Sequence, residues 1–65
     1  MSAVETYIET ESERVERWRT DELLRVGYEF EAATLIAADL EVDLHAAIDL
    51  VERGCPPDIA ARILL

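Results

Sequence analysis

Two glycines divide this chain of 65 residues, and each directly follows a stretch with helical spacing of apolar residues. Gly27 and Gly54 are 27 positions apart, and the residues around them align when one glycine is laid over the other. Glycine ends helices readily because it adopts positive φ without a steric penalty, and an apolar residue after it, here Tyr28, often folds back. We therefore expect two helix–Gly–helix units. The residues alone leave open whether they form a true structural repeat.

The spacing of apolar residues predicts an all-α protein, because they recur every three to four positions without the alternation of a strand. We expect a small helical bundle of three to four short helices. Asp39 and Asp43 are candidate N-caps of the third helix, and Pro56 and Pro57 suit the start of the fourth. The faces expected to turn inward carry Phe30, Ala33, Ile36, Ala37 and Leu40, then Leu44, Ala47, Ile48 and Val51, then Ile59, Ala60, Ile63 and Leu64.

The amino-terminal segment is predicted to form an amphipathic helical extension over residues 1–19, followed by the bundle over residues 20–65. Ser2 and Thr10 both fit a capping box, and Thr20 followed by two acids is a third candidate start. We expect either a kinked long helix or a frayed helix followed by a firm one over residues 20–26. Trp18 shares a stripe with Val4, Tyr7, Ile8 and Val15, and the sequence leaves open whether it is core or interface.

The charge balance excludes several partners. Fifteen acids against six bases, all Arg, give a formal net charge of −9. Nucleic acids and anionic membranes would repel such a chain, whereas a basic or apolar protein surface would suit it. The bias toward Arg and Ala suggests a GC-rich coding sequence and a bacterial source. The start of the chain has no secretory signal and no apolar run spans a membrane, so a cytoplasmic protein is expected.

No group of residues predicts catalysis, and no cofactor or metal is expected. A single cysteine, Cys55, excludes an internal disulfide, and a single histidine, His45, gives too few ligands for a metal site. We expect Cys55 to fill a small apolar corner and His45 to lie exposed on a helix. The acidic run of Glu9, Glu11, Glu13 and Glu16 is typical of a solvated helix face. The sequence thus favours a protein that is not an enzyme.

Three stretches resemble the ubiquitin-associated (UBA) domain: residues 23–28 (Leu-Leu-Arg-Val-Gly-Tyr), 32–36 (Ala-Ala-Thr-Leu-Ile) and 47–51 (Ala-Ile-Asp-Leu-Val). The resemblance covers residues 20–54 and implies a compact three-helix fold. It also implies that the Gly-aromatic loop and the end of the third helix form an apolar patch for a protein partner. Val26 stands where that family usually has Met, and the segment from Cys55 onward adds a fourth helix.

The function predicted from these observations is a non-enzymatic protein–protein interaction module. Its expected partner-binding residues are Trp18, Val26, Gly27, Tyr28, Leu50 and Val51. Two alternatives remain open. The first is a structural homodimer that pairs through its amino-terminal helix. The second is a small acidic regulator, of the antitoxin or anti-factor type, that masks a basic site on another protein.

Overall fold

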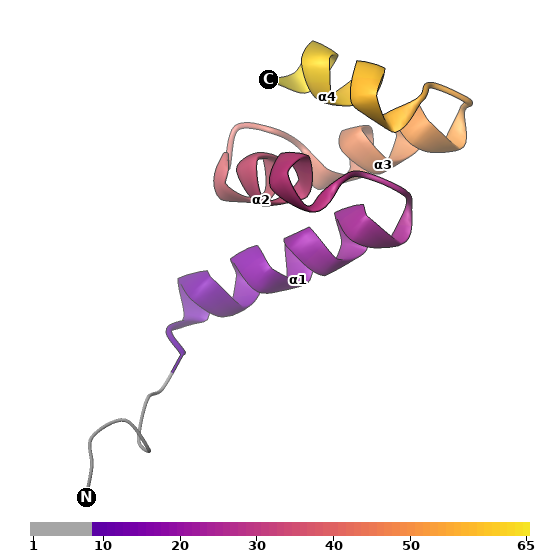
Figure 1. Ribbon diagram of the computed structural model, residues 1–65. Helices are drawn as coiled ribbons and strands as arrows, with labels where there is room; N and C mark the ends of the chain where they lie inside the picture. The colour runs from indigo at the N-terminus through magenta and orange to yellow at the C-terminus, as the bar shows by residue number, and fades with distance from the viewer. Residues whose placement is uncertain (1–8) are drawn as a thin grey trace, which may run out of the picture.

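The computed structural model describes residues 9–65, and this part of the chain consists of four helices joined by short connections (Figure 1). The helices are α1 (Glu11–Arg25), α2 (Phe30–Ala38), α3 (Leu44–Glu52) and α4 (Pro57–Leu64). The prediction of an all-α fold built as a small helical bundle is therefore confirmed. The predicted cap at Ser2 and the apolar residues Val4, Tyr7 and Ile8 lie outside the described residues.

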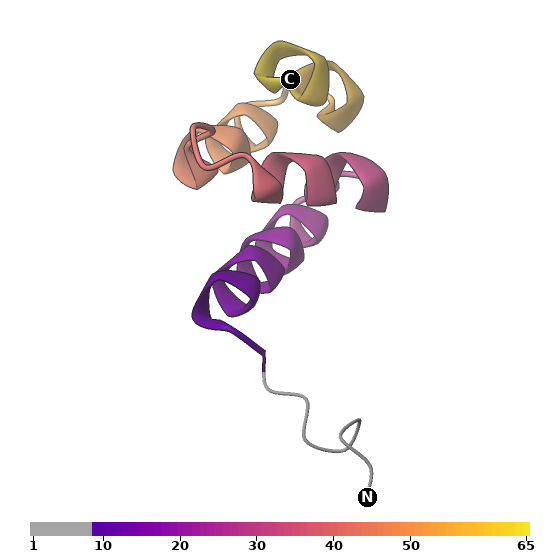
Figure 2. The ribbon, with the colours of Figure 1, turned by 90° about the vertical axis from the view of Figure 1, so that its left-hand side faces the viewer.

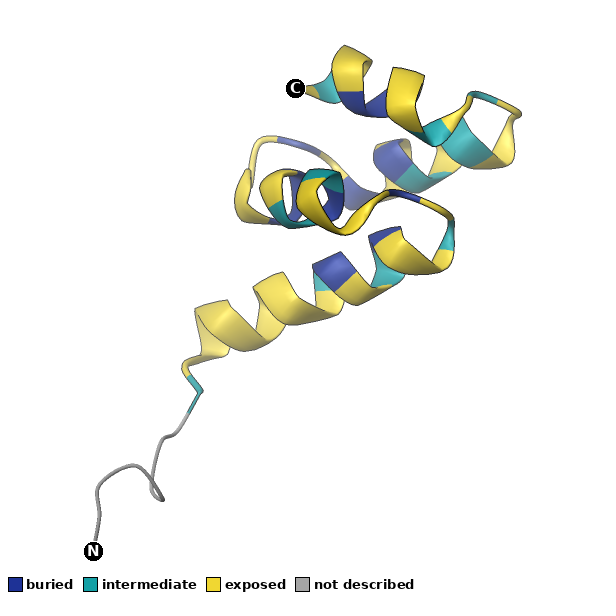
Figure 3. Ribbon diagram, viewed as in Figure 1, coloured by how far each residue is buried: buried dark blue, intermediate teal, exposed yellow. Residues whose placement is uncertain are grey.

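The helices α2 and α3 occupy the middle of the bundle, with α1 on one side and α4 on the other (Figures 1 and 2). Buried residues gather where these helices meet, whereas residues 10–18 are exposed throughout (Figure 3). The second half of α1 therefore belongs to the bundle, and its first half projects from it. The buried apolar residues are Leu23, Tyr28, Ala33, Ile36, Ala37, Val42, Leu44, Ala47, Ala60 and Ala61.

The first helix begins at one of the predicted caps and continues past another. The Thr10 hydroxyl accepts a hydrogen bond from the Glu13 amide at 3.1 Å, and the Glu13 carboxylate accepts one from the Thr10 amide at 2.9 Å. This capping box confirms the start at Thr10. Thr20, the third candidate start, does not begin a helix, because it lies inside α1 and its hydroxyl donates to the Glu16 carbonyl. The boundary proposed between residues 19 and 20 thus falls inside α1.

The first glycine corner has the hydrogen bonds of a Schellman motif. Gly27 has φ 114°, and its amide donates to the Leu24 carbonyl at 3.1 Å. The Tyr28 amide donates to the Leu23 carbonyl at 3.2 Å. These bonds satisfy two carbonyls that the end of α1 leaves unpaired, and they direct the chain back toward the core. The prediction that Gly27 ends a helix is confirmed.

The second glycine corner repeats the first. Gly54 has φ 104°, its amide donates to the Val51 carbonyl at 2.9 Å, and the Cys55 amide donates to the Leu50 carbonyl at 3.0 Å. In both units the next helix begins three residues after the glycine. The match extends to Ala33 and Ala60, which lie six residues after their glycines and are both buried. The two corners therefore share their backbone geometry and a buried alanine in the first turn of the helix that follows.

Several residues expected on inward faces are exposed instead. Phe30 is the first residue of α2, ahead of its packed turns, and Leu40 lies beyond the end of that helix. In α4 the small residues Ala60 and Ala61 face the core, which turns Ile59 and Ile63 toward solvent. The third helix follows its prediction more closely: Asp43 caps it by accepting from the His45 amide, and Leu44 and Ala47 are buried.

Candidate functional site

Trp18 and Tyr28, the two aromatic residues in the predicted binding set, have opposite environments. Trp18 keeps 55% of its surface exposed, whereas Tyr28 keeps 3%. The sequence left open which of them is core. The structure places Tyr28 in the core and Trp18 on the surface of α1.

Tyr28 is held in the core by both its ring and its hydroxyl group. The hydroxyl donates a 2.7 Å hydrogen bond to the Ala47 carbonyl in α3, so the side chain ties the first corner to the third helix. Burial, and secondarily the nearby Cys55 thiol, raise the pKa of the Tyr28 phenol. A partner cannot reach this side chain without opening the bundle. The Tyr28 side chain is therefore not part of the accessible surface of the Gly27–Tyr28 corner in this conformation.

The other predicted contact residues near the corner are partly covered. Val26, Leu50 and Val51 are half-buried and pack against the core. Gly27 itself is exposed, but a Cβ built on it would lie 3.3 Å from Cγ of Pro57. The start of α4 thus lies against the corner. The additional helix, which departs from the UBA pattern, approaches the loop that the resemblance assigns to a partner.

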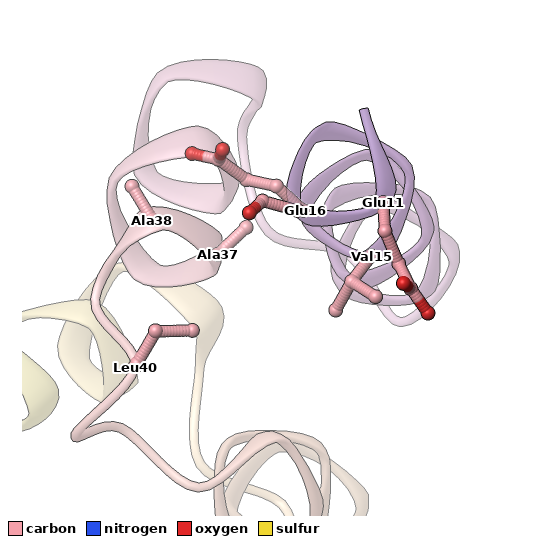
Figure 4. A pocket seen from close by; sticks show the side chains of 7 residues that line it. Glu11, Val15, Glu16, Ala37, Ala38 and Leu40 are labelled. Carbon is pink, nitrogen blue, oxygen red and sulfur yellow. The ribbon is translucent and has the colours of Figure 1, made fainter. Parts of the chain in front are cut away.

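An open apolar surface lies elsewhere, between the first half of α1 and the loop that follows α2. Two adjoining hollows share Val15 and Leu40 as lining residues, and Trp18 lines the second hollow. Figure 4 shows Val15 and Leu40 on opposite sides of the first hollow, with Ala37 and Ala38 along its α2 side. We call this surface, defined by Val15, Trp18 and Leu40, the Trp18 groove.

The apolar side chains of the Trp18 groove are unusually accessible. Val15 is 46% exposed, and Leu40 is 81% exposed, the largest fraction among the large hydrophobic residues of the described chain. Val15 and Trp18 are three positions apart in α1 and so share one face of it. Contiguous exposed apolar side chains rimmed by polar ones are typical of interaction sites. Sequence analysis identified Trp18 but missed Leu40, which the spacing wrongly assigned to the core.

Acidic side chains surround the Trp18 groove. Glu11 and Glu16 line its first hollow, and Glu41 and Asp43 line its second. No ion pair among residues 9–65 includes Glu11, Glu16 or Glu41. These carboxylates are exposed, so their field is directed at solvent and at any molecule that approaches the groove.

Arg19 fixes the wall of the groove that carries Leu40. Its guanidinium donates to the carbonyls of Ala37 at 3.1 Å, Ile36 at 3.3 Å, Asp39 at 3.2 Å and Val42 at 2.9 Å. These acceptors lie at the end of α2 and in the loop after it, where the helix dipole favours a cation. The Ile36 and Asp39 carbonyls also accept backbone amides, those of Asp39 and Val42. Arg19 therefore ties that loop to α1.

Sequence analysis missed this role of Arg19, although one signal was present. The last turn of α2 has no basic residue of its own, so the negative end of its dipole has no cation from within the helix. The Nε and one terminal nitrogen of Arg19 donate to these carbonyls. Arg19 lines the groove, and among residues 9–65 it forms no ion pair with a carboxylate.

The side chains that could bind a metal or take part in catalysis do not cluster within the described residues. Within residues 9–65 no group of three or more His, Cys, Asp or Glu is arranged to hold a metal ion. His45 is exposed on α3, and Cys55 is half-buried at the second corner, with its Sγ 3.6 Å from the Pro56 carbonyl oxygen. Glu9, Glu11, Glu13 and Glu16 lie on the surface, none of them buried. Within residues 9–65, His45, Cys55 and these carboxylates therefore do not form one metal-binding cluster.

No described helix is both long enough and apolar enough to cross a membrane. Comparisons of the chain with protein-family models, with curated proteins and with solved structures found no match. The resemblance to the UBA domain therefore stays a prediction.

Proposed function

We propose that this protein is a non-enzymatic protein–protein interaction module that docks its partner in the Trp18 groove. The observation that carries the proposal is the accessibility of Val15, Trp18 and Leu40 at one surface of a small chain. Aromatic residues such as Trp anchor interfaces because they bury a large area at low conformational cost. An exposed apolar surface of this kind adds little to the stability of the isolated chain.

The proposal moves the binding site away from the corner that the sequence favoured. Tyr28 is buried, and Val26, Leu50 and Val51 pack on the core. These four side chains therefore contribute to the stability of the fold, and little of their surface is left for a partner. Trp18 alone of the predicted contact residues belongs to the new site. The UBA resemblance supports an interaction role in general terms only, because fold likeness does not specify a partner. A cytoplasmic location and a bacterial source belong to the same proposal.

Capture from cells of the native host tests this proposal. Wild-type protein, the groove variant Leu40→Ser and the control Phe30→Ser are immobilised at equal density, and the retained proteins are identified. Phe30 is a matched control because it is also exposed, at 68%, and does not line the groove. We expect a protein retained by the wild type and by Phe30→Ser to be lost with Leu40→Ser. Retention of the same proteins by all three would contradict the proposal.

A further inference from the structure

We propose that the occupant of the Trp18 groove is an amphipathic helix of a partner protein, with Arg or Lys flanking its apolar stripe. This inference rests on the proposed function and adds the chemistry of the partner. It follows from the form of the groove, from its charge and from the kinds of recognition that an all-helical surface permits.

The form of the groove fits a short helical stretch. Its lining residues in α1 run from Glu11 to Arg19, which corresponds to about 12 Å at the 1.5 Å rise per helical residue. That length accommodates about two turns of a partner helix, which would present apolar side chains three or four positions apart. Val15 and Trp18 have the matching spacing on α1.

The described chain gives an extended peptide no sheet edge on which to bind. A peptide that binds as an added strand pairs with an exposed strand edge of the protein that binds it, and residues 9–65 contain no strand. Recognition of an extended segment would therefore lack the main-chain hydrogen bonds that supply its affinity. A helix satisfies its own backbone and needs only the apolar contact that the groove offers.

The negative charge of the groove indicates which residues should flank the apolar stripe of the partner helix. Four carboxylates, those of Glu11, Glu16, Glu41 and Asp43, line the two hollows. The single Arg among the lining residues, Arg19, is already bonded to four carbonyls. Arg or Lys on both sides of the partner's apolar stripe would meet these carboxylates and accelerate association.

The same charges disfavour two other occupants. A second copy of this chain would bring its own acidic rim and a net charge of −9 toward the groove. An anionic membrane would be repelled in the same way. Both occupants would leave the four carboxylates facing like charge, whereas a basic amphipathic helix pairs with them.

Binding of designed peptides to the full-length chain tests the inference. The first probe is a helix of about 18 residues, because shorter helices are marginal in water, with a Leu stripe flanked by Arg and without Trp. The second probe replaces each Arg with Glu, and the third scrambles the order so that the stripe is lost. Trp18 is the only tryptophan of the chain, so its fluorescence reports directly on the groove.

We expect a saturable blue shift of Trp18 emission with the basic peptide, and affinities weaker by about tenfold or more for the other two. Leu40→Ser should weaken binding of the basic peptide by about tenfold. The double variant Glu16→Gln/Glu41→Gln should weaken it and flatten its dependence on salt, because exposed charges are screened by ions. The controls Ile63→Ser and Glu52→Gln, exposed positions outside the lining of the groove, should bind as the wild type does.

Three results would overturn the inference. Equal binding of the acidic peptide would remove the role of charge, and no binding of any peptide would remove the helix. A dimer of the wild-type chain that Leu40→Ser dissociates in sedimentation would make a second copy the occupant. In each case, loss of a captured host protein with Leu40→Ser would still support the proposed function, which fails only if capture is independent of the groove.

Discussion

Trp18 and Tyr28 are ten positions apart, and their environments differ more than their chemistry does. Tyr28 is 3% exposed and bonded to the Ala47 carbonyl, whereas Trp18 is 55% exposed and lines an open groove. Tyr28 follows the glycine of a Schellman motif, which folds the chain back so that its side chain enters the core. Trp18 belongs to the half of α1 that projects from the bundle. Tyr28, which follows the helix-ending glycine, thus has a structural role, and Trp18, which lies away from it, is the candidate for binding.

Truncation of Tyr28 should have the largest effect on the fold. Tyr28→Ala removes a buried ring and its hydrogen bond, and losses of this kind cost about 3–5 kcal/mol, close to the whole stability of a small domain. We expect far-UV circular dichroism to show a largely unfolded chain. A folded variant with an unchanged urea midpoint would place the ring outside the core and erase the contrast with Trp18.

Loss of Arg19 should have the next largest effect. Arg19→Met keeps the apolar stem but leaves four carbonyls without their charged donor, and we expect a loss of about 2 kcal/mol in the free energy of unfolding. Hydrogen exchange should accelerate in the loop of residues 39–42. Arg17→Met is the matched control, because within residues 9–65 Arg17 has an exposed side chain and one ion pair, with Glu9, and its loss should cost less than about 1 kcal/mol. Equal effects of the two variants would contradict the role of Arg19.

Substitution of the two glycines compares the corners directly. Both have positive φ, so alanine at either position is expected to cost about 1–2 kcal/mol. Gly27→Ala should cost more than Gly54→Ala, because its Cβ would lie 3.3 Å from Pro57 Cγ, whereas Gly54 faces open space. Urea denaturation of both variants measures the difference. A larger loss at Gly54 would mean that Pro57 moves away from the first corner without cost.

The smallest expected effect concerns alkaline pH. Burial first, and the Cys55 thiol second, raise the pKa of Tyr28 in the folded protein above its unfolded value of about 10. The native state then holds this proton more tightly than the unfolded state, so stability falls as the pH rises above the unfolded value. Tyr28→Phe removes that proton, and its urea midpoint should decline less steeply with pH than that of the wild type. Parallel declines would show that the phenol is not buried.

Local rules predicted the helices and their ends better than they predicted the packing. The glycine stops, the Thr10 capping box, the Asp43 cap and the proline start of α4 depend on neighbouring residues, and the sequence contains that information. Thr20 was only one of three candidate starts, and its hydroxyl donates to a carbonyl inside α1 instead of capping a helix.

The candidate site depended on tertiary contacts, which periodicity does not contain. Leu40 continues the apolar spacing of α2, but α2 ends at Ala38. Leu40 therefore lies in the following loop, with its side chain exposed. The bonds of Arg19 to residues 36–42 join segments about twenty positions apart, and only the fold brings them together. Trp18 could be recognised as a candidate from the sequence, but its exposure had to be observed.

The most direct test of the account measures stability and partner capture together for Leu40→Ser and Tyr28→Phe. Leu40→Ser should leave the free energy of unfolding within about 0.5 kcal/mol of the wild type and abolish capture of the host protein. Tyr28→Phe should lose about 1 kcal/mol of stability, for the buried hydrogen bond, and retain that protein. Full capture by Leu40→Ser would show that the groove is not the binding site and would contradict the account. Loss of capture by a folded Tyr28→Phe would contradict it too, and would place the binding site at the glycine corner.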